Sequence, residues 1–179
     1  NSELAHYYLT HDSEHEVVAF SVDGSHMPER LEFCGLPICS FEKIDQFWPP
    51  KTNRFFAPLA ASRMNTLREQ VFKKIRQKGY SFVSYVSSRA TVFDNQIGQN
   101  CFILENNTLQ PFTEIGDNCV LWSGNHIGHH GYIGNHVTIT SQVVLSGRCK
   151  VQDKAFIGVN ATVRDGLNIG EGALIGMGA

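Results

Sequence analysis

Four histidines crowd the middle of the chain, and their type and spacing make them the residues best suited to chemistry. His126, His129, His130 and His136 follow one another within eleven residues. A neutral imidazole can take a proton from a reacting amine or hydroxyl, and it can also bind a metal ion. The spacing therefore leaves two kinds of site open: a general-base site and a metal site.

The element that must position these histidines is a six-residue repeat. From residue 97 to residue 175, every sixth residue is Ile, Leu or Val, at fourteen consecutive positions. A fixed hexapeptide period is the signature of a β-helix. Three hexapeptides make one triangular coil of eighteen residues, so each residue should lie beside those eighteen before and after it. The repeat positions are Ile97, Ile103, Leu109, Ile115, Leu121, Ile127, Ile133, Ile139, Leu145, Val151, Ile157, Val163, Ile169 and Ile175.

The coil length predicts that Gly147 lies beside His129. His129 is the second residue after Ile127, so its ring should sit at a turn outside the core, and Gly147 follows eighteen residues later. Acyl transfer needs such a pair: a base, typically worth about 10²–10⁴-fold, and a backbone N–H for the developing oxyanion, worth about 10²–10³-fold. The alternative is a surface histidine above a glycine that the turn geometry requires.

Asn107 and Asn125 also fall on inward positions of the repeat, one coil apart. A buried amide left without partners costs about 1–3 kcal/mol. We therefore expect the two side chains to bond to each other and to turn carbonyls, and so to hold the turn that carries the histidines.

The residues before the repeat alternate between strand and helix signals. They predict a small, parallel, Rossmann-like α/β domain over residues 1–82, followed by a β-helix domain over residues 83–179. Such a domain normally opens with a strand and a glycine-rich turn, so we expect these to lie upstream of the first residue and the coils to continue past the last. The expected elements are a helix over 2–9 with Ser2 as N-cap, strands over 16–22, 36–38, 54–59 and 80–86, and helices over 41–47 and 65–78.

The helix expected over 65–78 carries an apolar stripe of Leu67, Val71, Phe72 and Ile75. Arg68 lies next to this stripe, and a helical arginine of this kind is usually solvated. Its alternative role is to face a phosphate group.

Composition limits the partners and the compartment. The net charge is −2 over 179 residues, which argues against a nucleic-acid partner. The sequence has no apolar run near twenty residues and no signal peptide, so no membrane segment is expected. Three of the five cysteines, Cys101, Cys119 and Cys149, fall on inward positions, where a reduced thiol serves as a small hydrophobe. Reduced thiols indicate a cytoplasmic protein.

The repeat, with its run of aliphatic-Gly-x-x-small-x, resembles the hexapeptide-repeat acyltransferases, which fold as left-handed parallel β-helices. The two-part layout and the segment from Ile127 to Gly134 resemble the NeuD/PglD-like nucleotide-sugar acetyltransferases. This resemblance implies transfer of an acetyl group from acetyl-CoA to an amino or hydroxyl group of a nucleotide-linked sugar, in surface-polysaccharide or glycan biosynthesis. It implies that His129 is the general base and that the Gly147 N–H stabilises the tetrahedral intermediate.

The same resemblance implies a homotrimer with active sites between subunits and no metal. Acetyl-CoA would lie along the coils that follow the histidine segment, with contacts at Gly147, Val159, Arg164 and Met177. Asp23 matches the family's acidic residue at the edge of the nucleotide pocket, although an aspartate before Gly24 is also a common turn residue.

Two positions depart from the family pattern. Several relatives have Glu directly after the catalytic histidine, and His130 stands there; others place Asn seven residues before it, where this chain has Trp122. Either an acid from elsewhere orients His129 or the acceptor is held differently, so we assign His130, Trp122 and Asp23 to the acceptor.

Two further functions fit the same fold. A γ-carbonic-anhydrase-like metal site would resemble a pattern of two histidines five apart with a third about two coils away, and no pair within the repeat is five apart. A non-catalytic trimerisation module would not need an outward histidine over a glycine one coil on.

Overall fold

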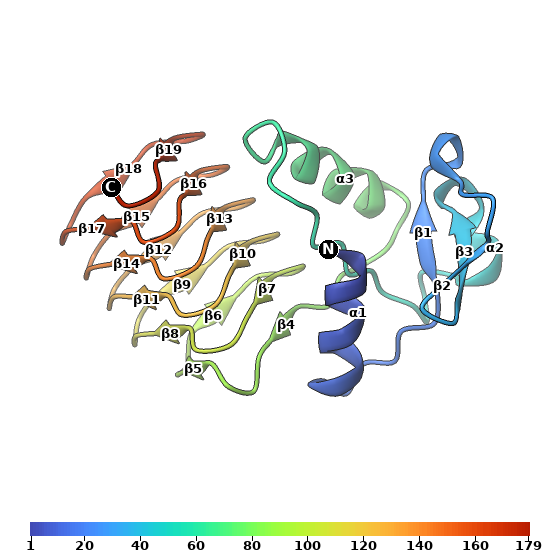
Figure 1. Cartoon of the computed structure of the whole chain (residues 1–179), viewed down its shortest axis with the longest axis horizontal. Helices are drawn as coiled ribbons and strands as arrows, with labels where there is room; N and C mark the ends of the chain where they lie inside the picture. Colours follow the sequence, from blue (N-terminus) through green and yellow to red (C-terminus); the bar gives the residue numbers. More distant parts are fainter.

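The computed structural model describes residues 1–179, and a triangular parallel β-helix makes up its C-terminal part (Figure 1). Each strand is two residues long and pairs in parallel with a strand eighteen residues away, as where His126 lies opposite Val144. Only the first coil differs, because Tyr85 lies opposite Phe102 and Thr91 opposite Thr108, which are seventeen residues on. The strands form three sheets, one on each side of the triangle. The eighteen-residue coil expected from the repeat is therefore confirmed.

We name the three sheets by what lies outside them. The covered face holds β4 (Tyr85–Val86), β7 (Phe102–Ile103), β10 (Val120–Leu121), β13 (Thr138–Ile139), β16 (Phe156–Ile157) and β19 (Leu174–Ile175). The uncharged face holds β5 (Thr91–Val92), β8 (Thr108–Leu109), β11 (His126–Ile127), β14 (Val144–Leu145) and β17 (Thr162–Val163). The charged face holds β6 (Gln96–Ile97), β9 (Glu114–Ile115), β12 (Tyr132–Ile133), β15 (Lys150–Val151) and β18 (Asn168–Ile169).

The repeat aliphatics fill the inside of the coils. All fourteen are the inward second residue of a strand, and they form one core together with small residues such as Cys119 and Ala155. Burying each one contributes roughly 1.5–3 kcal/mol. The asparagine ladder is also present: Asn125 Nδ2 donates to Asn107 Oδ1 over 2.9 Å, and Asn107 Nδ2 donates to the Leu104 carbonyl over 2.8 Å. These bonds satisfy the buried amides where the coil turns toward β11.

Helix α1 (Ser2–His11) packs on the covered face. Its buried residues Ala5 and Leu9 contact Tyr85 and Phe102, which point outward from the coils. The expected N-cap was wrong, because the helix begins after Asn1 and the Ser2 side chain makes no cap bond; the Asn1 side chain instead donates to the Pro58 carbonyl over 2.9 Å.

A small three-stranded sheet lies on the far side of α1 from the coils (Figure 1). Its order is β1-β3-β2; β1 (Phe20–Val22) and β3 (Leu36–Ser40) are parallel, and β2 (Glu32–Phe33) adds an antiparallel edge. The short helical stretch expected next is present as η2 (Phe41–Lys43) and α2 (Ile44–Phe47), and η1 (Gly24–His26) follows β1.

Three strand predictions in this part were wrong in extent. The strand expected over 16–22 forms only at its last three residues, because its first half has no neighbouring strand to pair with and Val18 is 40% exposed. The strand expected over 54–59 is a single bridge between Phe55 and Phe82, since Pro58 lacks the N–H that a ladder needs. The strand expected over 80–86 is confined to β4.

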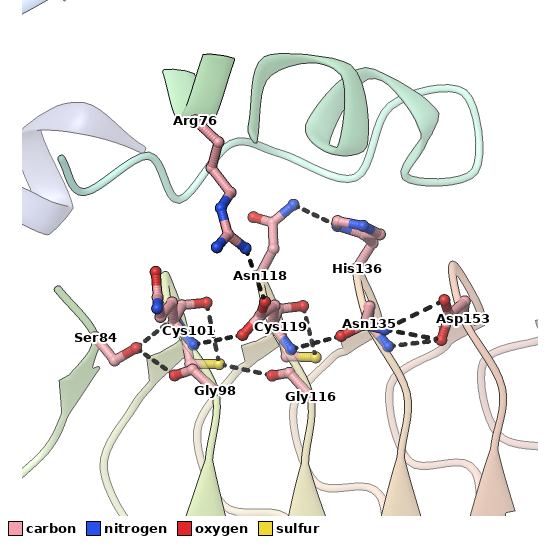
Figure 2. Close-up of polar contacts among 12 residues, drawn as sticks. Arg76, Ser84, Gly98, Cys101, Gly116, Asn118, Cys119, Asn135, His136 and Asp153 are labelled. Atoms are coloured by element: carbon pink, nitrogen blue, oxygen red, sulfur yellow. Dashed lines mark hydrogen bonds and ion pairs between the residues drawn. The ribbon is translucent and has the colours of Figure 1, made fainter. Parts of the chain in front are cut away.

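Helix α3 (Thr66–Gln77) docks along the corner where the charged face turns into the covered face, which we call the Asn118 corner (Figure 2). Phe72 and Ile75 are buried as expected, whereas Leu67 is partly exposed. Arg68 is not solvated but 1% exposed; its guanidinium donates to Thr138 Oγ1 over 2.8 Å and to the Asn118 carbonyl. Burial lowers the pKa of Arg68 to about 10. Arg68 therefore fixes α3 to the coils.

Candidate active site

The ring of His129 lies directly over Gly147. His129 is in the turn after β11, and Gly147 is one coil further on, in the turn after β14. A Cβ atom added to Gly147 would lie 2.7 Å from both Cε1 and Nε2 of His129. Only glycine leaves room for the ring at this distance. We call the corner that carries these turns, between the uncharged and the charged face, the Gly147 corner.

The backbone N–H of Gly147 donates no hydrogen bond within the chain. Its peptide is nevertheless held on both sides, because Ser146 N–H donates to the Val163 carbonyl over 2.9 Å and the Gly147 carbonyl accepts from Gly166 N–H over 2.9 Å. The result is a fixed donor on the residue that the ε edge of the His129 imidazole faces. That geometry suits stabilisation of a negative oxygen next to a base.

His129 is held by its backbone and by its ring. Its N–H donates to Gln110 Oε1 over 2.9 Å, and its carbonyl accepts from Arg148 N–H over 2.8 Å. The Nδ1 atoms of His129 and His130 lie 3.0 Å apart. Gln110 was missed in the sequence, although it lies one coil before Gly128 and the eighteen-residue spacing would have placed it beside this turn.

Arg164 is the other expected site residue on the Gly147 corner. It lies one coil after Ser146, and its side chain is exposed. Arg148 follows Gly147 directly and is also exposed. Two guanidinium groups thus stand on the C-terminal side of His129, where an anionic ligand would be attracted.

Val159, Met177 and Trp122 lie on a different corner, between the covered and the uncharged face, which we call the Glu105 corner. Val159 and Met177 are one coil apart there, and the Val159 carbonyl accepts from Gly178 N–H over 2.8 Å. Trp122 packs near α1 and borders a cavity of about 210 Å³ between residues 59–61 and the covered face. Within one chain, the expected acetyl-CoA contacts are therefore divided between two corners.

Asp23 does not approach His129 within one chain. It directly follows β1, a strand that lies on the far side of α1 from the coils (Figure 1), and its carboxylate pairs with Lys74 of α3.

The four clustered histidines separate in the fold. His126 points outward from the uncharged face, His129 and His130 occupy the Gly147 corner, and His136 is buried at the Asn118 corner. There Asn118 Nδ2 donates to His136 Nδ1 over 2.8 Å, as Figure 2 shows. No group of three or more His, Cys, Asp or Glu side chains is arranged to hold a metal ion.

The helices of the chain are short. None of them combines the length and the apolar character that crossing a membrane requires.

Comparisons with known proteins agree with the repeat. Residues 96–129 match the family model "Bacterial transferase hexapeptide (six repeats)", and residues 150–179 match "Hexapeptide repeat of succinyl-transferase". An acyl-[acyl-carrier-protein]–UDP-N-acetylglucosamine O-acyltransferase of Paracoccus denitrificans is 33% identical over 88 residues, which is 45% of this chain and 34% of that protein. The chain spans about a third of the length of such curated relatives.

Solved structures are similar over most of the chain. A point mutant of the perosamine N-acetyltransferase from Caulobacter crescentus, with CoA and GDP-perosamine bound, superposes with a TM-score of 0.74 at 23% identity, covering 88% of this chain and 73% of that one. The acetyltransferase domain of PglB from Neisseria gonorrhoeae, in complex with acetyl coenzyme A, gives 0.74 at 18% identity, covering 90% and 88%. The matched segments and the architecture show that the chain contains hexapeptide repeats and has the left-handed parallel β-helix fold of these acetyltransferases.

Proposed function

We propose that this protein transfers an acetyl group from acetyl-CoA to an amino or hydroxyl group of a nucleotide-linked sugar. The observation that carries the proposal is the ε edge of His129 over Gly147, whose N–H has no acceptor in the chain. Surface histidines are common, but a free donor fixed beside the ring is what acyl transfer needs.

The mechanism uses these two groups in turn. His129 Nε2 takes the proton of the acceptor amine or hydroxyl as its nitrogen or oxygen attacks the thioester carbonyl. The carbonyl oxygen becomes negative and accepts a hydrogen bond from Gly147 N–H. When the tetrahedral intermediate collapses, the C–S bond breaks, and the leaving thiolate takes the proton back from the His129 imidazolium. No metal and no covalent acyl-enzyme are required.

A homotrimer would bring the acetyl-CoA contacts of the Glu105 corner next to those of the Gly147 corner of a neighbouring subunit. The side chains that point outward from the uncharged face are Thr91, Thr108, His126, Val144 and Thr162. A face without charged side chains suits a subunit interface, whereas the charged face carries Glu114 and Lys150. In a closed ring, one edge of this face meets the opposite edge of the next subunit.

That contact would set Val159 and Met177 of one subunit near Arg164 and Gly147 of the next. CoA phosphates carry negative charge, and Arg148 and Arg164 would attract them. The uncharged face therefore supports acetyl-CoA binding between subunits rather than along one chain.

We assign residues 1–82 to acceptor binding and residues 83–179 to acetyl transfer. The Asp23 carboxylate, which follows β1 at the carboxyl end of a parallel pair, would accept from a base or ribose hydroxyl of the nucleotide. His130 and Trp122 belong to the acceptor side of the site in this assignment. All five cysteines are free thiols, which favours the cytoplasm, where nucleotide sugars would also be acetylated.

A coupled free-thiol assay tests the proposal. Purified protein is incubated with acetyl-CoA and a panel of UDP-, dTDP-, GDP- and CMP-linked amino sugars, and CoA thiol release is followed. Release that depends on one of the sugars supports the proposal. Absence of acetyl-CoA binding, measured by calorimetry, would refute it and favour a trimerisation module.

A further inference from the structure

His130 makes an unusual contact with the proposed base. The two Nδ1 atoms are 3.0 Å apart and the rings are perpendicular, at 90°. A hydrogen bond between two neutral imidazole nitrogens needs one proton, so one ring donates through Nδ1 and the other accepts with a bare Nδ1. The contact therefore fixes the tautomer of both rings together.

The surroundings of His129 favour one of the two arrangements. Its ε edge faces Gly147, whose N–H has no acceptor. A bare Nε2 is compatible with a neighbouring donor, whereas an Nε2–H would place two donors side by side. His129 should therefore carry its proton on Nδ1 and donate it to His130.

The Phe112 ring packs against the His130 ring, although the Phe112 backbone is in an unfavourable conformation. It lies one coil before His130, and the two ring centroids are 4.7 Å apart, tilted by 37°. Phe112 has φ of 65° and is 72% exposed. Left-handed backbone is unfavourable for a bulky residue. Over the turns of all three corners this position is most often Asn or Gly, as at Asn118, Asn160 and Gly166, although His130 shares the conformation with φ of 56°. An exposed phenyl ring in a strained turn needs a reason, and the contact with His130 supplies one.

We propose that His130 is the positioning residue of the site: it accepts the Nδ1–H of His129 and keeps Nε2 bare over Gly147, while Phe112 holds the His130 ring in place. The inference draws its catalytic meaning from the proposed acetyl transfer, but its structural content does not depend on that reaction. A neutral imidazole thus replaces a carboxylate as the group that orients the base.

Nitrogen-15 NMR of histidine-labelled protein tests the proposal without any substrate. At about pH 8.5, roughly two units above the ordinary histidine pKa, neutral rings dominate and long-range proton–nitrogen correlations distinguish the tautomers. The His129 signals are assigned by their loss in His129→Asn. We expect His129 to be the Nδ1–H tautomer in the unaltered protein. Finding mainly Nε2–H there would overturn the proposal.

Three variants distinguish a role of His130 in orienting the His129 ring from a role in folding. In His130→Phe, ring packing on Phe112 is kept but the acceptor is lost, so His129 should return to the Nε2–H tautomer that a free histidine side chain favours in water. In His130→Gln, the amide oxygen should restore Nδ1–H; glutamine tolerates this backbone, since Gln142 has φ of 61° at another corner. Phe112→Asn relieves the strained turn, so thermal stability should hold or rise while the His129 tautomer becomes mixed.

Kinetics distinguish failure of this inference from failure of the proposed function. We expect His130→Phe to lower kcat about tenfold or more, part of the roughly 10²–10⁴-fold that a general base supplies, with KM for acetyl-CoA little changed. His130→Gln should recover most of this loss. If His129 is the Nδ1–H tautomer but the protein transfers no acetyl group, the proposed function is refuted and the positioning role of His130 is not. Acetyl transfer that is unchanged in His130→Phe would refute the positioning role.

Discussion

Substitution of Gly147 by alanine tests the geometry of the candidate site most sharply. The added Cβ would lie 2.7 Å from two atoms of the His129 ring, whereas ordinary contact begins near 3.4 Å, so the ring must retreat by about 0.7 Å. A misplacement of about 1 Å can cost roughly 10²-fold in rate. We therefore expect kcat for acetyl transfer to fall about 30- to 100-fold in Gly147→Ala, with little change in thermal stability.

Gly116→Ala is the matched control. Gly116 lies at the Asn118 corner rather than beside His129, and a Cβ there would lie 2.8 Å from Asn135 Oδ1 and 2.9 Å from the Gly134 carbonyl oxygen. Its thermal stability should fall, because these neighbours must shift, whereas its kcat should be unchanged. Steady-state thiol release and thermal unfolding are measured on both variants. If Gly147→Ala folds and keeps kcat within about twofold of the unaltered protein, the close approach of His129 and Gly147 is not what performs the reaction.

Three further predictions concern assembly and stability. Val144→Lys places a charge on the uncharged face and should turn the proposed trimer into monomers in sedimentation velocity, whereas Glu114→Lys on the charged face should not. Arg68→Ala should destabilise the fold by about 2–4 kcal/mol in urea unfolding, because a buried hydrogen-bonded side chain is lost. His136 is neutral in the fold, because burial lowers its pKa. In the unfolded chain His136 takes up a proton near pH 6.5, whereas in the folded chain it does so only at lower pH. The folded state therefore keeps its full stability above about pH 6.5 and loses stability as the pH falls below that value. The loss of Tm between about pH 8 and pH 5.5 should therefore be smaller in His136→Asn than in the unaltered protein.

Each of these has an outcome that contradicts it. A trimer that persists in Val144→Lys would place the interface elsewhere. Arg76→Ala, on the same helix but half exposed, should cost less than about 1 kcal/mol; equal losses for the two arginines would refute the anchoring role of Arg68. Equal Tm shifts with and without His136 would mean that other groups set the pH dependence.

The sequence predicted the β-helix well because one physical pattern repeats in it. Fourteen aliphatics at a fixed period leave few ways to bury them, and the same period placed Gly147 beside His129 and Asn107 beside Asn125. These relations need only the coil length.

The N-terminal part was predicted less well because its structure depends on contacts that no period reveals. Whether residues 16–19 form a strand depends on a neighbour with which to pair, and none is adjacent. Arg68 looked like a solvated helix residue, and only the docking of α3 on the Asn118 corner makes it a buried anchor. Local sequence carries no record of that docking.

The candidate site was predicted in part for the same reason. The repeat placed His129 beside Gly147, but it could not show that Phe112 packs on His130 or that His130 contacts His129. The coil length does place Val159 and Met177 on a different corner from Arg164, but the acetyl-CoA contacts came from the family resemblance and not from this spacing. Contacts between side chains at a turn depend on rotamers, which the spacing of residues leaves open.

The central claim is that His129 is the base of an acetyl transfer, and the most direct measurement is the single-turnover rate of His129→Asn. Acetyl-CoA and the sugar identified in the panel are mixed with excess enzyme, and the acetylated sugar is quantified. We predict a rate about 10²–10⁴-fold below that of the unaltered protein, with acetyl-CoA affinity and the oligomeric state unchanged. A rate within about threefold of the unaltered protein would contradict the account.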